Sequence, residues 1–168
     1  MADNSNDNDS AYEQALRNAE AAYKKKMESL REQRLAIARE NARLGEAYVN
    51  SLSGADKPEK RKSGLYFTVL VAGDAAKMAT KADSVRVNYE GRLIDGKTFD
   101  KSRRPVEFPV SAVVAGFSEG VQLVGEGGKV RLYIPGDLGY GVNPPPGSSI
   151  QPGSMLVFDV EIVEVIKG

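Results

Sequence analysis

The apolar positions in the first third of the chain recur at the spacing of a helix. Over residues 12–52 they follow one another mostly in steps of three and four, so that they form a single stripe. A capping box at Ser10–Glu13 predicts the start of this helix, and Gly54 predicts its end. The pattern therefore predicts a helical arm over residues 10–54. Residues 1–9 are almost all Asp, Asn, Ser and Ala, and we expect them to form a disordered tail.

This helix is too long to bury its stripe against one small domain. About 40 residues span roughly 60 Å at 1.5 Å per residue, which exceeds what a compact domain of about 100 residues covers. We interpret the helix as a dimerisation arm in which two stripes pack together, with the polar interruptions Arg34 and Asn41 setting the register. The alternative is that the helix breaks near Arg34 and folds back as a hairpin within one chain.

The carboxy-terminal part of the chain changes to the period of a strand. Alternating or β-branched segments predict strands at 65–71, 84–94, 97–100, 106–109, 130–134 and 155–166. Asp95-Gly96 predicts a two-residue type I′ turn between the second and third of them. A short apolar segment at 113–124 has helical spacing but too many glycines to stand alone, so we expect the strands to curl around it. The fold class predicted is α+β, with an antiparallel sheet.

A polar segment separates the two patterns. Residues 55–63 carry several charges and Pro58, and we interpret them as a solvated linker. The chain then divides into the arm and a domain over residues 64–168.

Composition excludes several kinds of chemistry. The chain has no Cys and no His, which removes disulfides, thiolate nucleophiles and the usual zinc ligands. The 23 basic and 23 acidic residues balance, so nucleic acid is a poor candidate partner. No apolar run is long enough to span a bilayer. We therefore expect no metal, no cofactor and no membrane span, and a site built from carboxylates, hydroxyls, amides or shape.

Several segments of the domain together resemble one known family. They are residues 87–91, 93–102, 114–120, 134–135, 138–141 and 156–161. In order and spacing they are similar to the FKBP-type peptidyl-prolyl cis-trans isomerases, and the resemblance covers about residues 64–167. The end of the arm, residues 44–49, is similar to the arm through which members of the bacterial macrophage-infectivity-potentiator subgroup dimerise.

The resemblance implies a half-barrel sheet wrapped around the short helix, with the active pocket between them. Matching positions imply catalytic roles for Phe99, Asp100, Phe117 and Tyr140. They imply substrate-binding roles for Tyr89, Val106, Val113, Val114, Ile150 and Phe158. Two positions depart from the family: Phe117 stands where most members have Trp, and Val106 where many have Phe. Both residues are smaller than the usual one, which bears on macrolide affinity.

Alternatives remain open for individual residues. Asp100 is either the pocket carboxylate or a side chain that caps the hairpin turn. Each aromatic residue is either a pocket wall or plain core, and the second interpretation is favoured for Tyr66, Phe67 and Phe108.

Composition excludes the usual nucleophiles and metal ligands, and the family resemblance implies a reaction that needs neither. Rotation about an Xaa-Pro bond breaks no covalent bond, so it needs neither a nucleophile nor a metal. We expect an isomerase with chaperone activity that acts on proline-containing unfolded or partly folded polypeptides, with macrolide inhibitors as further candidate ligands. The alternative is a non-catalytic holdase that binds proline. The polar start resembles the mature end of an exported protein, which predicts the periplasm or cell envelope, with the cytoplasm as the alternative.

Overall fold

The computed structural model describes residues 5–168, and the chain divides into two compact units, Met1–Ala36 and Ile37–Gly168. Helix α1 (Ser5–Ser51) supplies the whole described part of the first unit and is continuous, so the alternative of a hairpin that breaks near Arg34 is wrong. It begins ahead of the capping box at Ser10 and ends before Gly54. Residues 1–4 of the predicted tail lie outside the described residues.

The apolar stripe of the first unit is exposed. The exposed fractions are 70% for Tyr12, 47% for Leu16, 67% for Tyr23, 45% for Met27 and 41% for Leu30. Contiguous exposed apolar side chains of this kind are uncommon on the surface of monomeric proteins. Within residues 5–168, no helix combines the length and the apolar character that a bilayer span requires.

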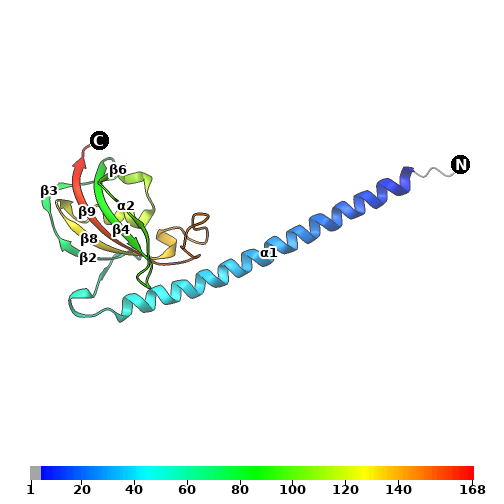
Figure 1. The fold of residues 1–168 in the computed structure, drawn as a ribbon, viewed down its shortest axis with the longest axis horizontal. Helices are drawn as coiled ribbons and strands as arrows, with labels where there is room; N and C mark the ends of the chain where they lie inside the picture. The colour runs from blue at the N-terminus through cyan, green and yellow to red at the C-terminus, as the bar shows by residue number, and fades with distance from the viewer. Residues whose placement is uncertain (1–4) are drawn as a thin grey trace. The chain divides into compact units, whose positions relative to one another are not determined.

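The second unit is a curved antiparallel sheet with a short helix against one face (Figure 1). Its elements after α1 are η1 (Gly54–Asp56), β1 (Glu59–Lys60), β2 (Tyr66–Val71), β3 (Asp74–Met78), β4 (Ser84–Arg92), β5 (Thr98–Lys101), β6 (Val106–Pro109), η2 (Val110–Ala112), α2 (Ala115–Gly120), β7 (Gly125–Glu126), β8 (Lys129–Ile134), η3 (Gly136–Leu138) and β9 (Leu156–Ile166). The seven-stranded sheet has the order β1-β2-β8-β9-β4-β5, and β6 also pairs with β4. Strands β3 and β7 form a separate two-stranded sheet. The predicted α+β class is confirmed.

The inner face of the sheet packs on α2. The alternating residues predicted to face inward are buried there, as in Val130, Leu132 and Ile134 of β8. Helix α2 approaches β8 through two glycines one turn apart. A Cβ on Gly116 would lie 2.5 Å from Ile134 Cγ2, and one on Gly120 would lie 2.3 Å from Leu132 Cδ1. Because glycine has no Cβ, the helix reaches a distance that any other residue would prevent.

The outer face of the sheet is covered at one end by the last turns of α1. Tyr133 and Val157 form a second apolar cluster with Val49 of the helix. Gly45 also faces this cluster, since a Cβ there would lie 2.9 Å from Met155 Cβ. At this end of α1 the residues of the predicted stripe pack on the domain and do not face a second helix. Tyr48 and Leu52 both contact this cluster.

Asn41 is not available to set the register of a dimer seam as we predicted. Its amide Nδ2 donates a hydrogen bond to the carbonyl oxygen of Pro152 at 2.9 Å. The same face of α1 thus carries one polar contact beside the apolar ones.

Two local predictions differ from the structure. Within the predicted linker, Glu59 and Lys60 form β1 and pair with β2. The hairpin after β4 is not type I′, because in the described chain only glycines adopt a positive φ and Asp95 is not among them. Gly96 has φ +89° and its N–H donates to Leu93 O at 2.9 Å, which fits a type I turn followed by a glycine bulge.

Substituting Gly116 by alanine should destabilise the domain by about 1–3 kcal/mol, because the new Cβ overlaps the branched Ile134 side chain in a packed core. The helix propensity of alanine offsets only about 1 kcal/mol of this cost. Urea denaturation measures the difference. Glu119→Ala on the outer side of α2 is the control and should cost less than about 1 kcal/mol, because it removes only a partly exposed ion pair. Equal stability of Gly116→Ala and wild type would contradict the close approach.

Candidate active site

Four aromatic rings from four elements meet where α2 faces the sheet. The centroids of Phe117 and Phe158 are 5.1 Å apart and their planes are nearly perpendicular, at 87°. Phe99 lies 5.5 Å from Phe158, and Tyr89 lies 6.2 Å from both Phe117 and Phe158. Edge-to-face packing of this kind is favourable beyond the area that it buries. Phe117 and Phe158 are 5% and 6% exposed and form the floor, whereas Tyr89 and Phe99 are only half-buried.

Gly91 makes room for this aromatic cluster. It lies on β4 opposite Phe158 on β9 and Asp100 on β5. A Cβ there would lie 2.7 Å from Phe99 Cζ and 2.7 Å from Phe158 Cε1. Sequence reasoning missed this role, because the periodicity of a strand does not show which residue a ring lies over.

Asp100 is connected to the cluster through Tyr89. The Tyr89 hydroxyl donates a hydrogen bond to Asp100 Oδ2 at 3.0 Å. Burial raises the pKa of Tyr89 to about 12, and the hydrogen bond and charge of Asp100 act in the same direction. The Tyr89 hydroxyl therefore remains a donor to Asp100 even at alkaline pH, where an ordinary tyrosine would ionise.

The contacts separate the roles of two nearby aspartates. Asp95 Oδ1 accepts the backbone N–H of Lys97 at 2.9 Å and caps the hairpin turn. Asp100 instead accepts the hydrogen bond from the Tyr89 hydroxyl, which favours the pocket interpretation over the turn-capping one.

Several of the other predicted site residues belong to, or pack against, the core that contains Phe117, and Val113 also lines the groove described below. Ile150 is 5% exposed and belongs to the core that contains Phe117, and Val113 and Val114 pack against this core. Tyr140 is 38% exposed and is close enough to Tyr89 to contribute to its raised pKa.

Strand β6 adds a residue to the aromatic cluster that the sequence did not single out, and the role of Val106 stays a prediction. Val106 pairs with Val87 on β4 and is 38% exposed, outside the buried core. Phe108, interpreted as plain core, places its ring 5.4 Å from that of Phe117. The aromatic residue two positions along the same strand was the available signal, because alternate residues of a strand share a face.

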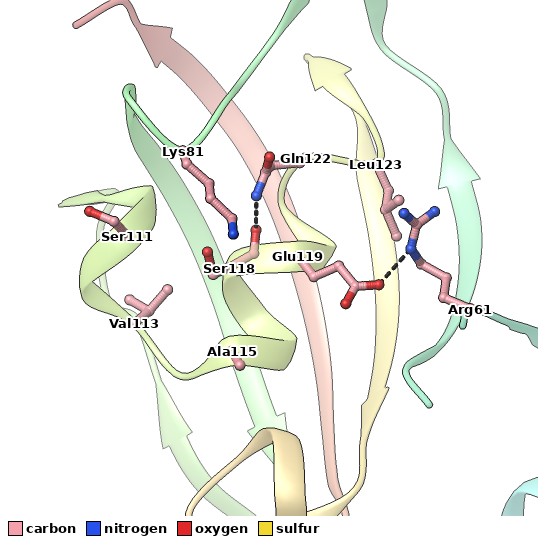
Figure 2. Close-up of a pocket in the computed structure, with 9 residues that line it drawn as sticks. All are labelled: Arg61, Lys81, Ser111, Val113, Ala115, Ser118, Glu119, Gln122 and Leu123. Atoms are coloured by element: carbon pink, nitrogen blue, oxygen red, sulfur yellow. Dashed lines mark hydrogen bonds and ion pairs between the residues drawn. The ribbon is translucent and has the colours of Figure 1, made fainter. Parts of the chain in front are cut away.

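A groove of about 700 Å³ lies on the other side of α2 (Figure 2). The helix places Phe117 toward the sheet, whereas Ala115, Ser118 and Glu119 line the groove. Arg61 Nε bonds Glu119 Oε2 at 2.5 Å and so ties the segment after β1 to the helix.

The site offers an apolar surface, hydrogen-bonding groups and one carboxylate. It has a nearly dry aromatic floor, the carboxylate of Asp100 at its rim and the exposed hydroxyl of Tyr140. Among the described residues, no cluster of three or more acidic side chains is arranged to hold a metal ion.

The family model described as FKBP-type peptidyl-prolyl cis-trans isomerase matches residues 75–163, which include the whole aromatic cluster. The chain belongs to this family. The isomerase match begins within β3 and ends within β9, so it covers α2 and the strands around it.

Individual relatives extend the likeness into the arm. The chain is 42% identical over 137 residues to a probable FkpA isomerase of Neisseria meningitidis, covering 80% of this chain and 50% of that protein. It is 36% identical over 168 residues to FkpA of Escherichia coli K12, covering 98% of this chain and 60% of that protein. The chain thus spans between half and three fifths of the length of these curated relatives.

Solved structures give the same result. The crystal structure of FkpA from Escherichia coli superposes with a TM-score of 0.77 at 35% identity, covering 93% of this chain and 72% of that chain. An isomerase from Pseudomonas syringae superposes with a TM-score of 0.68 at 32% identity, covering 79% of this chain and 95% of that chain. The likeness to FkpA therefore includes a long amino-terminal helix.

Replacing Gly91 by alanine should displace the rings of Phe99 and Phe158 and lower the free energy of unfolding by about 1–3 kcal/mol, because the added methyl overlaps both rings. Aromatic NMR shifts and urea denaturation measure the two effects. Gly96→Ala is the control: it strains a positive φ in open space and should leave the ring signals unchanged. Unchanged ring signals in Gly91→Ala would contradict the role assigned to this glycine.

Proposed function

We propose that this protein is a peptidyl-prolyl cis-trans isomerase that accelerates rotation about Xaa-Pro bonds in folding polypeptides. The observation that carries the proposal is the perpendicular packing of Phe117 on Phe158 at 5.1 Å, which makes a nearly dry aromatic floor. The membership of the family and the absence of Cys and His from the chain support a reaction that breaks no covalent bond.

The physical basis of the catalysis is preference for a twisted amide. A planar amide resists rotation by roughly 18–20 kcal/mol because twisting removes its resonance. The twisted form has less charge separation across the C–N bond, so an apolar surface favours it over the planar forms. Binding that form more tightly than either planar form lowers the barrier.

Each side chain of the site has a proposed role in binding or polarising the substrate. The proline ring packs against the side chains of Phe99, Phe117, Phe158 and Ile150. Tyr140, with its exposed hydroxyl, donates a hydrogen bond to a backbone carbonyl beside the proline. Asp100, held by the Tyr89 hydroxyl, orients the rim and polarises the surroundings of the rotating carbonyl.

Tyr140→Phe and Asp100→Ala should each lower kcat/KM for a short Xaa-Pro peptide by about 3- to 10-fold, because each removes one hydrogen-bonding or charged group at the site. Neither side chain belongs to the buried core, so circular dichroism should report a folded domain. Tyr12→Phe and Asp56→Ala are matched controls outside the site and should behave as wild type. Full activity in both site variants would contradict the assigned roles.

A second candidate function, a holdase, is favoured by the exposed apolar side chains of the arm. In this alternative the aromatic site only recognises proline. A folded wild type that suppresses aggregation of an unfolded client but does not isomerise Xaa-Pro peptides would support the holdase.

The arm is proposed to join two copies of the chain. The exposed stripe from Tyr12 to Leu30 repeats at three and four residues, and its apolar side chains lie on one side of α1. An antiparallel or parallel pair would bury the stripe without any other protein. This pairing corresponds to assignment to the macrophage-infectivity-potentiator-like subgroup, which is also a proposal.

The double variant Leu16→Glu with Met27→Glu should raise the dissociation constant of the dimer at least about 100-fold, because pairing would bury unpaired carboxylates. Sedimentation of the full chain measures the change. Ala21→Glu with Ser29→Glu adds the same charge on the opposite side of the helix and should leave the dimer intact. A wild type that remains monomeric at tens of micromolar would contradict the dimer.

The substrates, inhibitors and location complete the proposal. Unfolded or partly folded chains containing proline are the proposed substrates. Macrolides are candidate inhibitors, and their affinity is expected to reflect Phe117 and Val106, which are smaller than the residues usual in the family. We place the protein in the periplasm or cell envelope on the basis of its similarity to the FkpA proteins. Fractionation of cells that express the protein from its natural gene tests this location.

A further inference from the structure

The loop that carries Tyr140 and Ile150 has no helix or strand of its own. It runs over residues 139–155, between η3 and β9. A connection of this length in a compact domain is mobile unless specific contacts hold it. Two residues assigned to the site therefore depend on whatever orders this 139–155 loop.

The two ends of the 139–155 loop are joined at its base. The backbone N–H of Gly153 donates to Gly141 O at 2.8 Å, and that of Gly141 donates to Gly136 O at 2.7 Å. The base is tight, since a Cβ on Gly136 would lie 2.8 Å from Gly153 Cα. Gly153 is thus hydrogen-bonded directly to Gly141, the residue that follows Tyr140.

Gly153 is part of a turn over residues 151–154. Ser154 N donates to Gln151 O at 3.1 Å, and Gly153 has φ +73°. Proline at the second position and a glycine with positive φ at the third are typical of a type II turn. The central peptide of such a turn is oriented opposite to that of a type I turn, and its carbonyl, Pro152 O, takes no part in the closing hydrogen bond of the turn.

Helix α1 holds this turn at two points. Asn41 Nδ2 donates to Pro152 O at 2.9 Å, and the contact is partly buried. Gly153 lies directly on the helix backbone, where a Cβ would come within 2.4 Å of Ala38 O. The hydrogen bond from Asn41 favours the observed orientation of the central peptide, and the close approach requires glycine at 153 independently of its φ.

We infer that Asn41 is a positioning residue of the site. It fixes the 151–154 turn, the turn fixes the base of the 139–155 loop, and the loop presents Tyr140 and Ile150 to the aromatic cluster. This role rests on the proposed isomerase activity. The end of α1 is accordingly part of the isomerase unit as well as the end of the arm.

A purely structural role makes a different prediction. Tyr48, Val49, Met155 and Val157 already hold the end of α1 against the sheet through apolar contacts. If Asn41 only added to this docking, its loss would change stability and leave the loop and the catalytic constants unaltered.

The experiment compares Asn41→Ala with Asn50→Ala in the full chain. Asn50 lies on the same stretch of α1 and is exposed, so its replacement removes the same amide without touching the turn. We expect Asn41→Ala to lower kcat/KM by about 3- to 10-fold, mainly through kcat, and Asn50→Ala to change it less than about 2-fold. Asn41→Asp should lower it further, because a carboxylate cannot donate to Pro152 O and repels it.

Amide hydrogen exchange supplies a readout that does not depend on activity. Exchange at Gly141 and Gly153 should be at least about 10-fold faster in Asn41→Ala than in wild type, with β4 and β9 unchanged. Faster exchange with unaltered kcat/KM would overturn the positioning role, and so would identical behaviour of the two alanine variants. A wild type that shows no isomerase activity would overturn the proposed function and the catalytic part of this inference, while exchange would still decide whether Asn41 orders the loop.

Discussion

The close approach of α2 to β8 is the contact on which the rest of the domain depends. Gly116 and Gly120 lie one turn apart on the same face of a six-residue helix, over Ile134 and Leu132. A helix this short is unstable by itself and forms only where tertiary packing supports it. The absence of side chains on that face lets the helix backbone come close enough for Phe117 to reach the aromatic ring of Phe158 on β9.

The site itself follows from this placement and from one further glycine. Gly91 leaves the space above β4 that Phe99 and Phe158 fill, so the aromatic floor is a consequence of missing side chains on both the helix and the sheet. Polar groups remain at the rim, where the Tyr89 hydroxyl donates a hydrogen bond to Asp100 and burial raises the pKa of the phenol. A dry floor beside a hydrogen-bonding rim suits a reaction in which the amide changes its polarity without changing its bonds.

The outer face of the sheet gives α1 a second role. Its last turns cover Tyr133, Met155 and Val157, and Asn41 reaches the turn that closes the loop beside the site. Gly45 and Gly153 permit this docking in the same way that Gly116 and Gly120 permit the docking of α2. The end of the long helix is thus part of the domain, although Ile37 and Leu44 on this stretch remain exposed, at 44% and 38%.

Sequence alone determined the elements whose signal is local. The strict alternation in β4, β8 and β9 and the proline at the end of β6 identified these strands, because a half-buried strand must alternate. Contacts between distant residues required the tertiary structure. The positions of Gly91, Phe108 and Asn41 depend on partners at residues 158, 117 and 152, and β1 exists only because β2 pairs with it. The turn at Asp95 was misassigned for a related reason: its register is set by strand pairing with a bulge, and a two-residue motif cannot encode where that bulge falls.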